Sequence, residues 1–430
     1  MHVYFAGIGG SAIGPLAMIA KQAGWQVSGS DVRDSSYIKY LRERGLSDIH
    51  IGQDGSQIAT VHAKRPIDWF VYSSALPLTD PSHPELKFCQ QNGIKTSKRD
   101  EFLSDLIKEK SLKLIAVTGT HGKTTTTAMA IWLFKQMDLP VSYSVGSKLS
   151  FGEMGQFDPD SQYFVYEADE YDRNFLSFYP EIALISGLDW DHPDIYPSRE
   201  SYYSAFLEFI GQATQTVLWR DDAEKLGLSA ADNLKILDEK DSQIDVAVKL
   251  AGHVNRLDAW LTAYGLQALF NQPAEELIKH LNEFPGASRR FETIAPNLYS
   301  DYAHTPPKIR GALQLAHETA GDNVVVVYEG IHNLRQHFMK DEFKNLFDSV
   351  KKVYIVPTYL GREDGDLEIL TPAKLLDLLS NSARPKAEPA KLDDDLKQTI
   401  QNHLAGGDLV IGFSAGSAGG LDEWLRQEFQ

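Results

Sequence analysis

Short apolar runs alternate with amphipathic stretches from one end of the chain to the other. The short runs predict strands and the amphipathic stretches predict helices. Strands are predicted at residues 2–6, 26–29, 69–72, 114–117, 163–167, 182–186, 298–302, 323–328, 352–356 and 408–412, and helices at 15–23, 124–136 and 251–270. Strands that alternate with helices in this way favour an α/β fold with parallel sheets.

The length of the chain, 430 residues, suggests about three domains of roughly 150 residues each. One boundary is expected in the charged run IKEKSLK (107–113), which has the composition of a linker. The other is expected at FPGASRRFE (284–292), which precedes the last group of strands. The predicted domains are therefore 1–108, 109–288 and 289–430.

Charge and targeting signals exclude several classes of function. The formal net charge of −17 repels phosphate backbones, so nucleic-acid binding is not expected, and an anionic substrate would need local basic residues. No apolar stretch approaches the length of about 20 residues that a membrane helix needs, and the opening MHVYFAGIGG is not a signal peptide. The single cysteine, Cys89, forms no intramolecular disulfide. We expect a cytoplasmic protein without membrane insertion.

The segment VTGTHGKTT (117–125) has the residues of a phosphate-binding loop between a strand and a helix. Its glycines let backbone amides turn around phosphate oxygens, and the helix N-terminus adds a partial positive charge. Lys123 supplies a charge for the terminal phosphates of ATP, and the Thr124 hydroxyl can ligate Mg²⁺. The loop is a variant, because Val117 stands where the general motif has its first glycine. The predicted ATP-binding residues here are Gly119, Thr120, His121, Gly122, Lys123, Thr124 and Thr125.

The acidic segment EADEYD (167–172) ends another predicted strand. Carboxylates at a strand end that faces a phosphate loop are suitable ligands for Mg²⁺, which takes oxygen ligands. Glu167, at the strand end, is a candidate for such a ligand, with a solvated acidic loop as the alternative. A solvated acidic loop is the plainer interpretation for Asp169 and Asp172.

The segment GIGGSA (7–12) follows the first strand and fits the pattern G-x-G-x-x-A. Asp31 closes the next strand about 20 residues further on. Taken alone, this is the fingerprint of a dinucleotide-binding turn with Asp31 on a ribose, and it would suit a nicotinamide-dependent dehydrogenase. That interpretation leaves TGTHGKTTT and EADE without a role.

In order along the chain, these motifs resemble those of the Mur ligases, which build the peptide of bacterial peptidoglycan. The motifs are GIGGSAIG, VSGSD, SSA, TGTHGKTTT, EADEYD, DWDH, PGASRRFE, DYAHTP and the closing SAGSAGG. They span nearly the whole chain, and TGTHGKTTT with EADE is the most specific pair. The loop with a histidine resembles the loop of the branch of the family that acts on UDP-N-acetylmuramate itself. The resemblance implies a Rossmann-like N-terminal domain, a central P-loop ATPase-like domain with a mostly parallel sheet, and a C-terminal Rossmann-like α/β domain.

The resemblance gives the first glycine turn a different ligand, the pyrophosphate of a UDP-sugar. Ser30 and Asp31 would lie near the uridine, while Ser73 and Ser74 would reach phosphate or sugar hydroxyls. The implied UDP-sugar-binding residues are Gly7, Gly9, Gly10, Ser11, Ser30, Asp31, Ser73, Ser74 and Arg99. Capping of a helix or a turn is the alternative role for the serines.

The resemblance also implies metal ligands and a third domain that closes over ATP and recognises the amino acid. The metal ligands would be Thr124, Glu167 and His192. The further ATP contacts would be Asn255, Arg289 and Asp301, and the catalytic residues would be Lys123, Glu167, His192, His304 and Arg335. A surface salt bridge or cap is the alternative for His304 and Arg335. The chain departs from the family pattern at Val254, Asp258, Thr305 and His332.

The reaction that the resemblance implies is ATP-dependent ligation of L-alanine to the lactyl carboxylate of UDP-N-acetylmuramate through an acyl phosphate. The expected partners are these two substrates, ATP and Mg²⁺, with the protein a monomer or a homodimer. Within the family the alternative is the recycling ligase that attaches a ready-made tripeptide, to which EADEYD is similar. A non-catalytic nucleotide-binding subunit is a further alternative, and the intact Lys123 and Glu167 argue against it.

Overall fold

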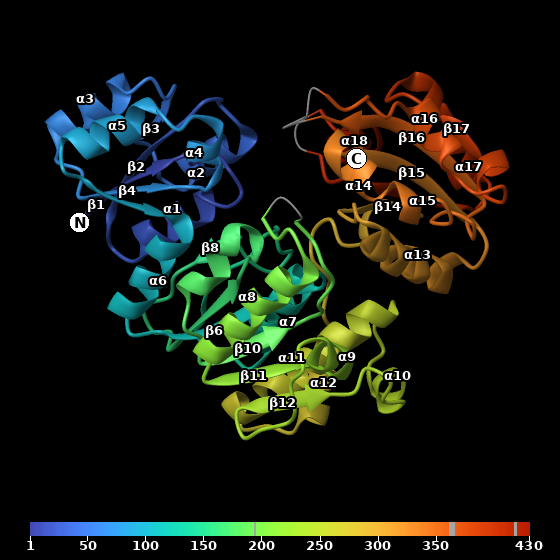
Figure 1. Ribbon diagram of the computed structural model, residues 1–430, viewed down its shortest axis with the longest axis horizontal. Coiled ribbons are helices and arrows are strands. Elements are labelled where there is room, and N and C mark those ends of the chain that lie inside the picture. The colour runs from blue at the N-terminus through green and yellow to red at the C-terminus, as the bar shows by residue number, and fades with distance from the viewer. Residues whose placement is uncertain (193–194, 361–365, 417–418) are drawn as a thin grey trace. The chain divides into compact units, whose positions relative to one another are not determined.

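The computed structural model of the protein describes residues 1–192, 195–360, 366–416 and 419–430 (Figure 1). It confirms the predicted α/β class, with three separate sheets of mostly parallel strands that are flanked by helices. Every strand and helix predicted from the pattern is present, with ends that differ by three residues or fewer. In the described part of the chain, no helix combines the length and the apolar character needed to cross a membrane.

The first sheet has five parallel strands in the order β3-β2-β1-β4-β5. All of β1 is buried, because helices cover both faces of the sheet. Val3 and Phe5 pack on one face with α1 and α6, and Tyr4 and Ala6 pack on the other face with α3 and α5. The elements are β1 His2–Ala6, α1 Gly14–Gln22, β2 Gln26–Asp31, α2 Ser36–Glu43, β3 Ile49–Ile51, α3 Ser56–Lys64, β4 Trp69–Tyr72, α4 Ala75–Thr79, α5 Pro84–Gln91, β5 Lys95–Lys98 and α6 Arg99–Glu109.

The second sheet has seven strands in the order β12-β11-β10-β6-β9-β7-β8, and only the short β8 is antiparallel to its neighbour. Its centre is β6, which pairs with β10 on one side and β9 on the other. The strands are β6 Lys113–Thr118, β7 Ser142–Ser144, β8 Gly155–Gln156, β9 Tyr163–Glu167, β10 Ile182–Ile185, β11 Gln215–Trp219 and β12 Leu234–Leu237. The helices are α7 Lys123–Gln136, η1 Tyr171–Ser177, α8 Arg199–Gln212, α9 Arg220–Lys225, α10 Gln243–Ala247, α11 His253–Phe270 and α12 Ala274–Leu281.

The third sheet has six strands in the order β13-β14-β18-β15-β16-β17, and β13 is antiparallel at one edge. The central β15 alternates, with Val324 and Val326 in one hydrophobic cluster and Val325 and Val327 in the other. The elements are β13 Glu292–Ala295, β14 Leu298–Asp301, α13 Pro306–Ala320, β15 Val324–Ile331, α14 Asn333–Phe338, α15 Lys340–Phe343, β16 Lys352–Tyr359, α16 Pro372–Asp377, η2 Arg384–Lys386, β17 Ala387–Pro389, α17 Asp394–Ala405, β18 Leu409–Phe413 and α18 Leu421–Phe429.

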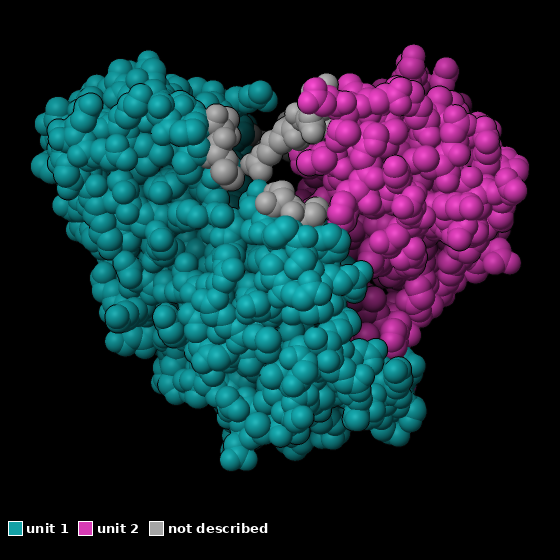
Figure 2. Space-filling view, viewed as in Figure 1, with its two compact units in different colours: residues 1–248, 258–284 teal, residues 249–257, 285–430 magenta. Residues whose placement is uncertain are grey.

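The chain divides into two compact units (Figure 2). The first contains residues 1–248 and 258–284, and therefore both of the first two sheets. The second contains residues 249–257 and 285–430, so the start of α11 belongs with the third sheet. The finer division at 108/109 and 288/289 stays a prediction.

Only part of the charged run at 107–113 is a linker, because a helix and a strand extend into its two ends. Helix α6 continues to Glu109 and β6 begins at Lys113, so residues 110–112 connect them. The helix extends this far because Leu106 and Ile107 pack into the core, and this burial outweighs the charged residues beside them.

Candidate active site

The loop between β6 and α7, residues 119–122, turns on two glycines. Gly119 (φ 136°) and Gly122 (φ 72°) have positive φ angles that residues with side chains rarely adopt. A Cβ at Gly119 would lie 2.8 Å from the carbonyl oxygen of Gly187, and a Cβ at Gly122 would overlap the carboxylate of Asp258. These positions require glycine, and α7 begins immediately after them at Lys123.

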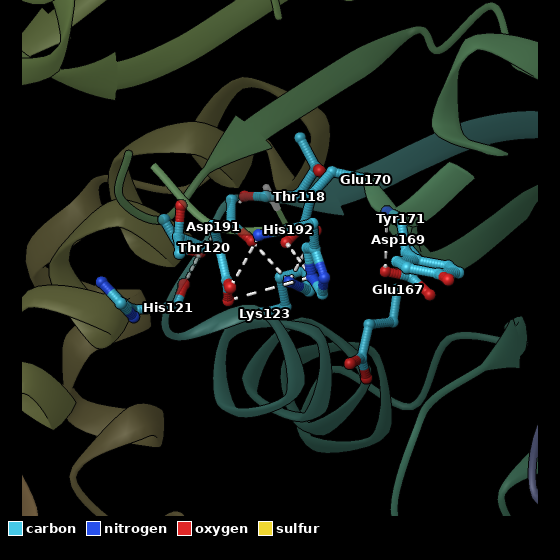
Figure 3. Close-up of polar contacts among 12 residues, drawn as sticks. Thr118, Thr120, His121, Lys123, Glu167, Asp169, Glu170, Tyr171, Asp191 and His192 are labelled. Carbon is cyan, nitrogen blue, oxygen red and sulfur yellow. Dashed lines mark hydrogen bonds and ion pairs between the residues drawn. The ribbon is translucent and has the colours of Figure 1, made fainter. Parts of the chain in front are cut away.

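Lys123 is held by two acceptors of the protein itself. Its Nζ donates to the Gly119 carbonyl at 2.5 Å. It also donates to Glu170 Oε2 at 2.7 Å (Figure 3). The Glu170 side chain is only 1% exposed. Burial acts to lower the pKa of Lys123, but the carboxylates of Glu170 and Asp169 outweigh it and raise that pKa above its ordinary value. Lys123 is therefore a permanent cation at the start of the helix.

Thr124, on the first turn of α7, is in contact with Glu167 at the end of β9. The Thr124 hydroxyl donates to Glu167 Oε1 at 2.8 Å, and the Gly146 amide donates to Glu167 Oε2 at 2.7 Å. Strand pairing produces this arrangement, because Val117 near the end of β6 lies opposite Glu167 at the end of β9. The predicted proximity of the acidic segment to the phosphate loop is thus present.

The carboxylates of the segment 167–172 differ in their partners. Glu170 pairs with Lys123, Asp169 with Arg99 and Asp172 with Lys98. Among the described residues, the recorded donors to Glu167 are a neutral hydroxyl and a neutral amide. Within the described part of the chain, Glu167 therefore accepts hydrogen bonds from neutral donors, and Lys123 attracts its charge without a direct ion pair.

The predicted metal ligands are only partly brought together. Thr124 and Glu167 are in contact, but His192 Nε2 lies 3.8 Å from carboxylate oxygens of Glu170 and Asp191. His192 also has a left-handed backbone (φ 56°). Within the described ranges, no three or more His, Cys, Asp and Glu side chains are grouped closely enough to hold a metal ion. The oxygens of Thr124 and Glu167 suit a hard cation, and His192 as a ligand stays a prediction.

Thr120 and His121 contribute to the loop as structural residues in this conformation. The Thr120 hydroxyl is buried and bonds the Asp189 carbonyl and the Tyr202 hydroxyl. His121 Nε2 lies 2.8 Å from Asp189 Oδ2, and the imidazole extends away from Lys123 (Figure 3). The hydrogen bond from His121 is the main reason that the pKa of Asp189 is lowered. The Thr120 amide itself donates to the Gly187 carbonyl at 2.7 Å, so contact of Thr120 and His121 with a nucleotide stays a prediction. Thr125 is buried in α7.

The first glycine turn is closed by Asp31. Gly7 and Ile8 donate to the Ser30 carbonyl, and Gly9 donates to Asp31 Oδ2 at 2.9 Å. Gly9 has no room for a side chain, because a Cβ there would lie 2.8 Å from Ile38. Asp31 thus caps the turn, while Gly10 and Ser11 are exposed beside it.

The serines predicted near the UDP-sugar have partners inside the first unit. Ser30 is fully buried, and its hydroxyl donates to Glu85 Oε2 at 2.9 Å and accepts from Gln53. The Ser74 hydroxyl donates to Asn174 at 3.4 Å, while Ser73 is half-buried. Ser30 therefore points into the core beneath the turn in this structure, and its role as a ligand contact stays a prediction.

Glu85 is a buried acid that the sequence did not reveal. It accepts hydrogen bonds from Tyr4 at 2.9 Å and from Ser30, and both of its neighbours lie on strands of the first sheet. Burial raises the pKa of Glu85 to about 7. No local pattern marks it, because its partners are distant along the chain.

In the second unit, Arg289 and Asp301 make hydrogen bonds that hold the backbone just before β13. Arg289 Nη2 donates to the Ser414 carbonyl at 2.7 Å, and its guanidinium lies 4.6 Å from the centre of the Tyr302 ring. Asp301 accepts from the backbone amides of Phe291 and Ala303, and burial raises its pKa. Both residues have structural partners in the unit, and their contact with nucleotide stays a prediction.

The remaining predicted residues of the second unit lie on its loops and helix starts. His304 is buried, with Nδ1 2.8 Å from the Tyr302 carbonyl, and Arg335 is half-buried on α14. Asn255, on the first turn of α11, donates to the Ala251 carbonyl at 2.9 Å. Their catalytic and nucleotide-binding roles stay predictions.

Two descriptions of protein families match the chain: "Mur ligase family, catalytic domain" at residues 2–111 and "Mur ligase middle domain" at residues 117–249. The UDP-N-acetylmuramate–L-alanine ligase of Clostridium novyi (strain NT) is 29% identical over 447 residues, covering 96% of this chain and 94% of the relative. That of Coxiella burnetii (strain CbuG_Q212) is 29% identical over 472 residues, covering 100% and 98%.

Solved structures share the fold over the whole chain. The UDP-N-acetylmuramate–alanine ligase MurC of Thermotoga maritima is 23% identical with a TM-score of 0.76, and the match covers 100% of this chain and 98% of the other. The murein peptide ligase Mpl of Psychrobacter arcticus is 19% identical with a TM-score of 0.65 and the same coverage.

Proposed function

This chain belongs to the Mur ligase family, and we propose that it joins L-alanine to UDP-N-acetylmuramate with hydrolysis of ATP to ADP and phosphate. The observation that carries the proposal is the nearly full-length similarity to several UDP-N-acetylmuramate–L-alanine ligases. The arrangement of Lys123, Thr124 and Glu167 supports it, since it combines a phosphate-type loop with a carboxylate whose hydrogen-bond donors are neutral.

The reaction needs activation of a carboxylate. The lactyl carboxylate of UDP-N-acetylmuramate resists attack because it is anionic and has a poor leaving group. Transfer of the γ-phosphoryl group of ATP gives an acyl phosphate, and the amine of L-alanine then attacks its carbonyl carbon and expels phosphate. The first step depends mainly on positioning and on balancing charge.

Several residues of this chain supply that positioning. Lys123 would provide a fixed positive charge at the terminal phosphates, and backbone amides at the start of α7 would contact the phosphate oxygens. In the second unit, Arg335 would bind a carboxylate with its planar fork, and His304 would lie beside the incoming amine. We propose Asn255, Arg289 and Asp301 as the nucleotide contacts of that unit.

The oxygens of Thr124 and Glu167 would hold Mg²⁺, with His192 as a further proposed ligand. The cation would supply charge neutralisation between the phosphates and the substrate carboxylate. Glu167 suits this role because its recorded partners are neutral donors.

We propose that residues 1–108 bind the UDP-sugar, 109–288 bind ATP, and 289–430 recognise the amino acid. The glycine turn Gly7–Gly10 would lie against the pyrophosphate, with Ser11, Ser73 and Ser74 at its sides. The dehydrogenase alternative is excluded by the family to which the chain belongs. ATP and a nucleotide-linked precursor as substrates suit a cytoplasmic enzyme, acting as a monomer or a homodimer.

A second candidate substrate is a ready-made tripeptide in place of L-alanine. The segment EADEYD favours it by its similarity to the recycling branch, and the fold is shared with the murein peptide ligase of Psychrobacter arcticus. Both candidates use the same activation of the lactyl carboxylate, so they differ only in the nucleophile.

An ADP-release assay with UDP-N-acetylmuramate tests the proposal. L-alanine, glycine, L-serine and the tripeptide L-alanyl-γ-D-glutamyl-meso-diaminopimelate are offered separately, and the product is identified by mass. Release that depends on L-alanine supports the proposal, and release that depends only on the tripeptide assigns the chain to the recycling reaction. Nucleotide binding without release for any amine would contradict both.

A further inference from the structure

The acidic segment 167–172 is tied to the junction of β5 and α6. Lys98 Nζ donates to Asp172 Oδ2 at 2.5 Å, and Arg99 Nη2 donates to Asp169 Oδ2 at 3.1 Å. Lys98 is the last residue of β5 and Arg99 is the first of α6. Two successive residues at the end of the first sheet therefore hold the segment that begins at the end of β9 in the second sheet.

Arg99 is anchored on its other side. Its Nε donates to Asp100 Oδ2 at 2.9 Å, and the Tyr166 hydroxyl donates to Asp100 Oδ1 at 2.5 Å. Asp100 is 1% exposed, and Tyr166 directly precedes Glu167 on β9. Burial acts to lower the pKa of Arg99, but Asp100, Tyr166 and Asp169 raise it above the usual range. Arg99 is thus a fixed, charged bridge between α6 and the acidic segment.

The backbone of the segment also needs external support. Asp172 (φ 53°) and Arg173 (φ 56°) lie in the left-handed region. Residues with side chains keep this conformation only where surrounding contacts hold them. The ion pair between Lys98 and Asp172 supplies one such contact directly at the strained position.

The far side of the same segment reaches the phosphate loop, because Glu170 holds Lys123. We propose that Lys98 and Arg99 are positioning residues that set Lys123 for nucleotide through Asp172, Asp169 and Glu170. Arg99 then acts through the acidic segment, in place of the direct contact with a UDP-sugar predicted from the sequence. The inference rests on the proposed function, since it requires residues 119–125 to bind ATP.

Binding constants of the full-length protein test this inference. Isothermal titration gives the dissociation constants of a non-hydrolysable ATP analogue and of UDP-N-acetylmuramate, each alone. We expect Arg99→Gln and Lys98→Met to weaken binding of the ATP analogue by about fivefold or more, within the usual range of coupling between sites. The dissociation constant of UDP-N-acetylmuramate should stay within about twofold of wild type, because Lys98 and Arg99 do not contact that ligand in this inference.

The matched control is Arg173→Gln, which removes the exposed ion pair between Arg173 and Glu208 directly after the acidic segment. It is expected to leave both constants unchanged, since exposed pairs contribute little. A charge swap then separates positioning from damage to the fold. Lys98→Glu and Asp172→Lys are each expected to weaken binding of the ATP analogue, and the double variant to restore it.

Two results would overturn the inference. One is an Arg99→Gln variant that loses affinity only for UDP-N-acetylmuramate, which would make Arg99 a direct ligand. The other is unchanged affinity for the ATP analogue in the Lys98 variants. If Arg99→Gln does not fold, the Lys98 variants alone test the inference. A wild type that binds the analogue but ligates no amine would remove the proposed reaction and leave the positioning role standing.

Discussion

Thr124 donates a hydrogen bond to Glu167 over 2.8 Å, joining the first turn of α7 to the end of β9. The two residues are 43 positions apart along the chain, and only the pairing of β6 with β9 brings them together. This contact places a hydroxyl and a carboxylate beside the phosphate loop, where ligation of ATP-bound Mg²⁺ would take place.

Lys123→Ala should lower the rate of ADP release by about 10²- to 10³-fold, because it removes a fixed charge at the terminal phosphates. Steady-state assays at saturating substrates measure the effect. Lys279→Ala is the control, since that lysine is exposed on α12 and pairs only with Glu276 among the recorded contacts of the described residues. A Lys123→Ala variant with wild-type turnover would remove the catalytic assignment of the loop.

Glu167→Gln should raise the Mg²⁺ concentration needed for half-maximal activity by about tenfold or more, because loss of a metal-site partner commonly costs 10- to 100-fold in affinity. The measurement is activity against Mg²⁺ at fixed ATP. Glu181→Gln, at an exposed ion pair with Lys113, is expected to leave the curve in place. Equal Mg²⁺ requirements for Glu167→Gln and wild type would contradict the proposed metal site.

Gly119→Ala should destabilise the protein by about 1–3 kcal/mol, because it forces a side chain into a positive φ against the Gly187 carbonyl. Gly211→Ala is the opposite case, since Gly211 lies in α8 and a Cβ there meets no atom within 4 Å. That change should be neutral or stabilise by about 0.5–1 kcal/mol. Denaturant unfolding of both variants compares the two, and equal stabilities would refute the steric argument.

Stability should fall as pH rises from about 4.5 through about 7 because of Glu85. Its pKa is raised to about 7 in the folded protein from an ordinary value of 4.5, so the buried carboxyl favours its proton. The stabilising contribution of Glu85 is fully present below the pKa of the unfolded state. It is lost as pH rises through the pKa of the folded state, and the loss is on the order of 3 kcal/mol. Denaturant unfolding across pH 4–8 should show a flatter profile for Glu85→Gln than for wild type. Parallel profiles would mean that Glu85 does not titrate in this range.

The fold was predictable for most strands that lie inside a sheet, although β7 and β11 were not predicted. Strands such as β1 and β15 are mostly apolar because helices cover both of their faces. Strands at or near the edges escaped prediction for the opposite reason. β5 reads KTSK and β17 reads AEP, so neither has the apolar run that indicates a strand.

The site was predictable only in its local parts. The glycines, Lys123 and Thr124 lie within one motif, and the acidic segment lies at a strand end. The partner of Lys123 was not assigned, because the pairing with Glu170 spans 47 positions. The bonds of Ser30 with Glu85 span 55 positions and depend on how α5 packs on the sheet. No spacing rule reports such contacts, since they depend on tertiary packing.

The pairing of Lys123 with Glu170 has a kinetic consequence. A lysine that is already neutralised projects little field into solvent, and the protein as a whole carries a charge of −17. An approaching ATP therefore meets long-range repulsion. Lys123 can leave Glu170 and bind a phosphate only after the ATP has reached the loop. Added salt screens that repulsion, so the association rate measured by stopped flow should increase with ionic strength, whereas a decrease would mean that an attractive patch guides the nucleotide inward.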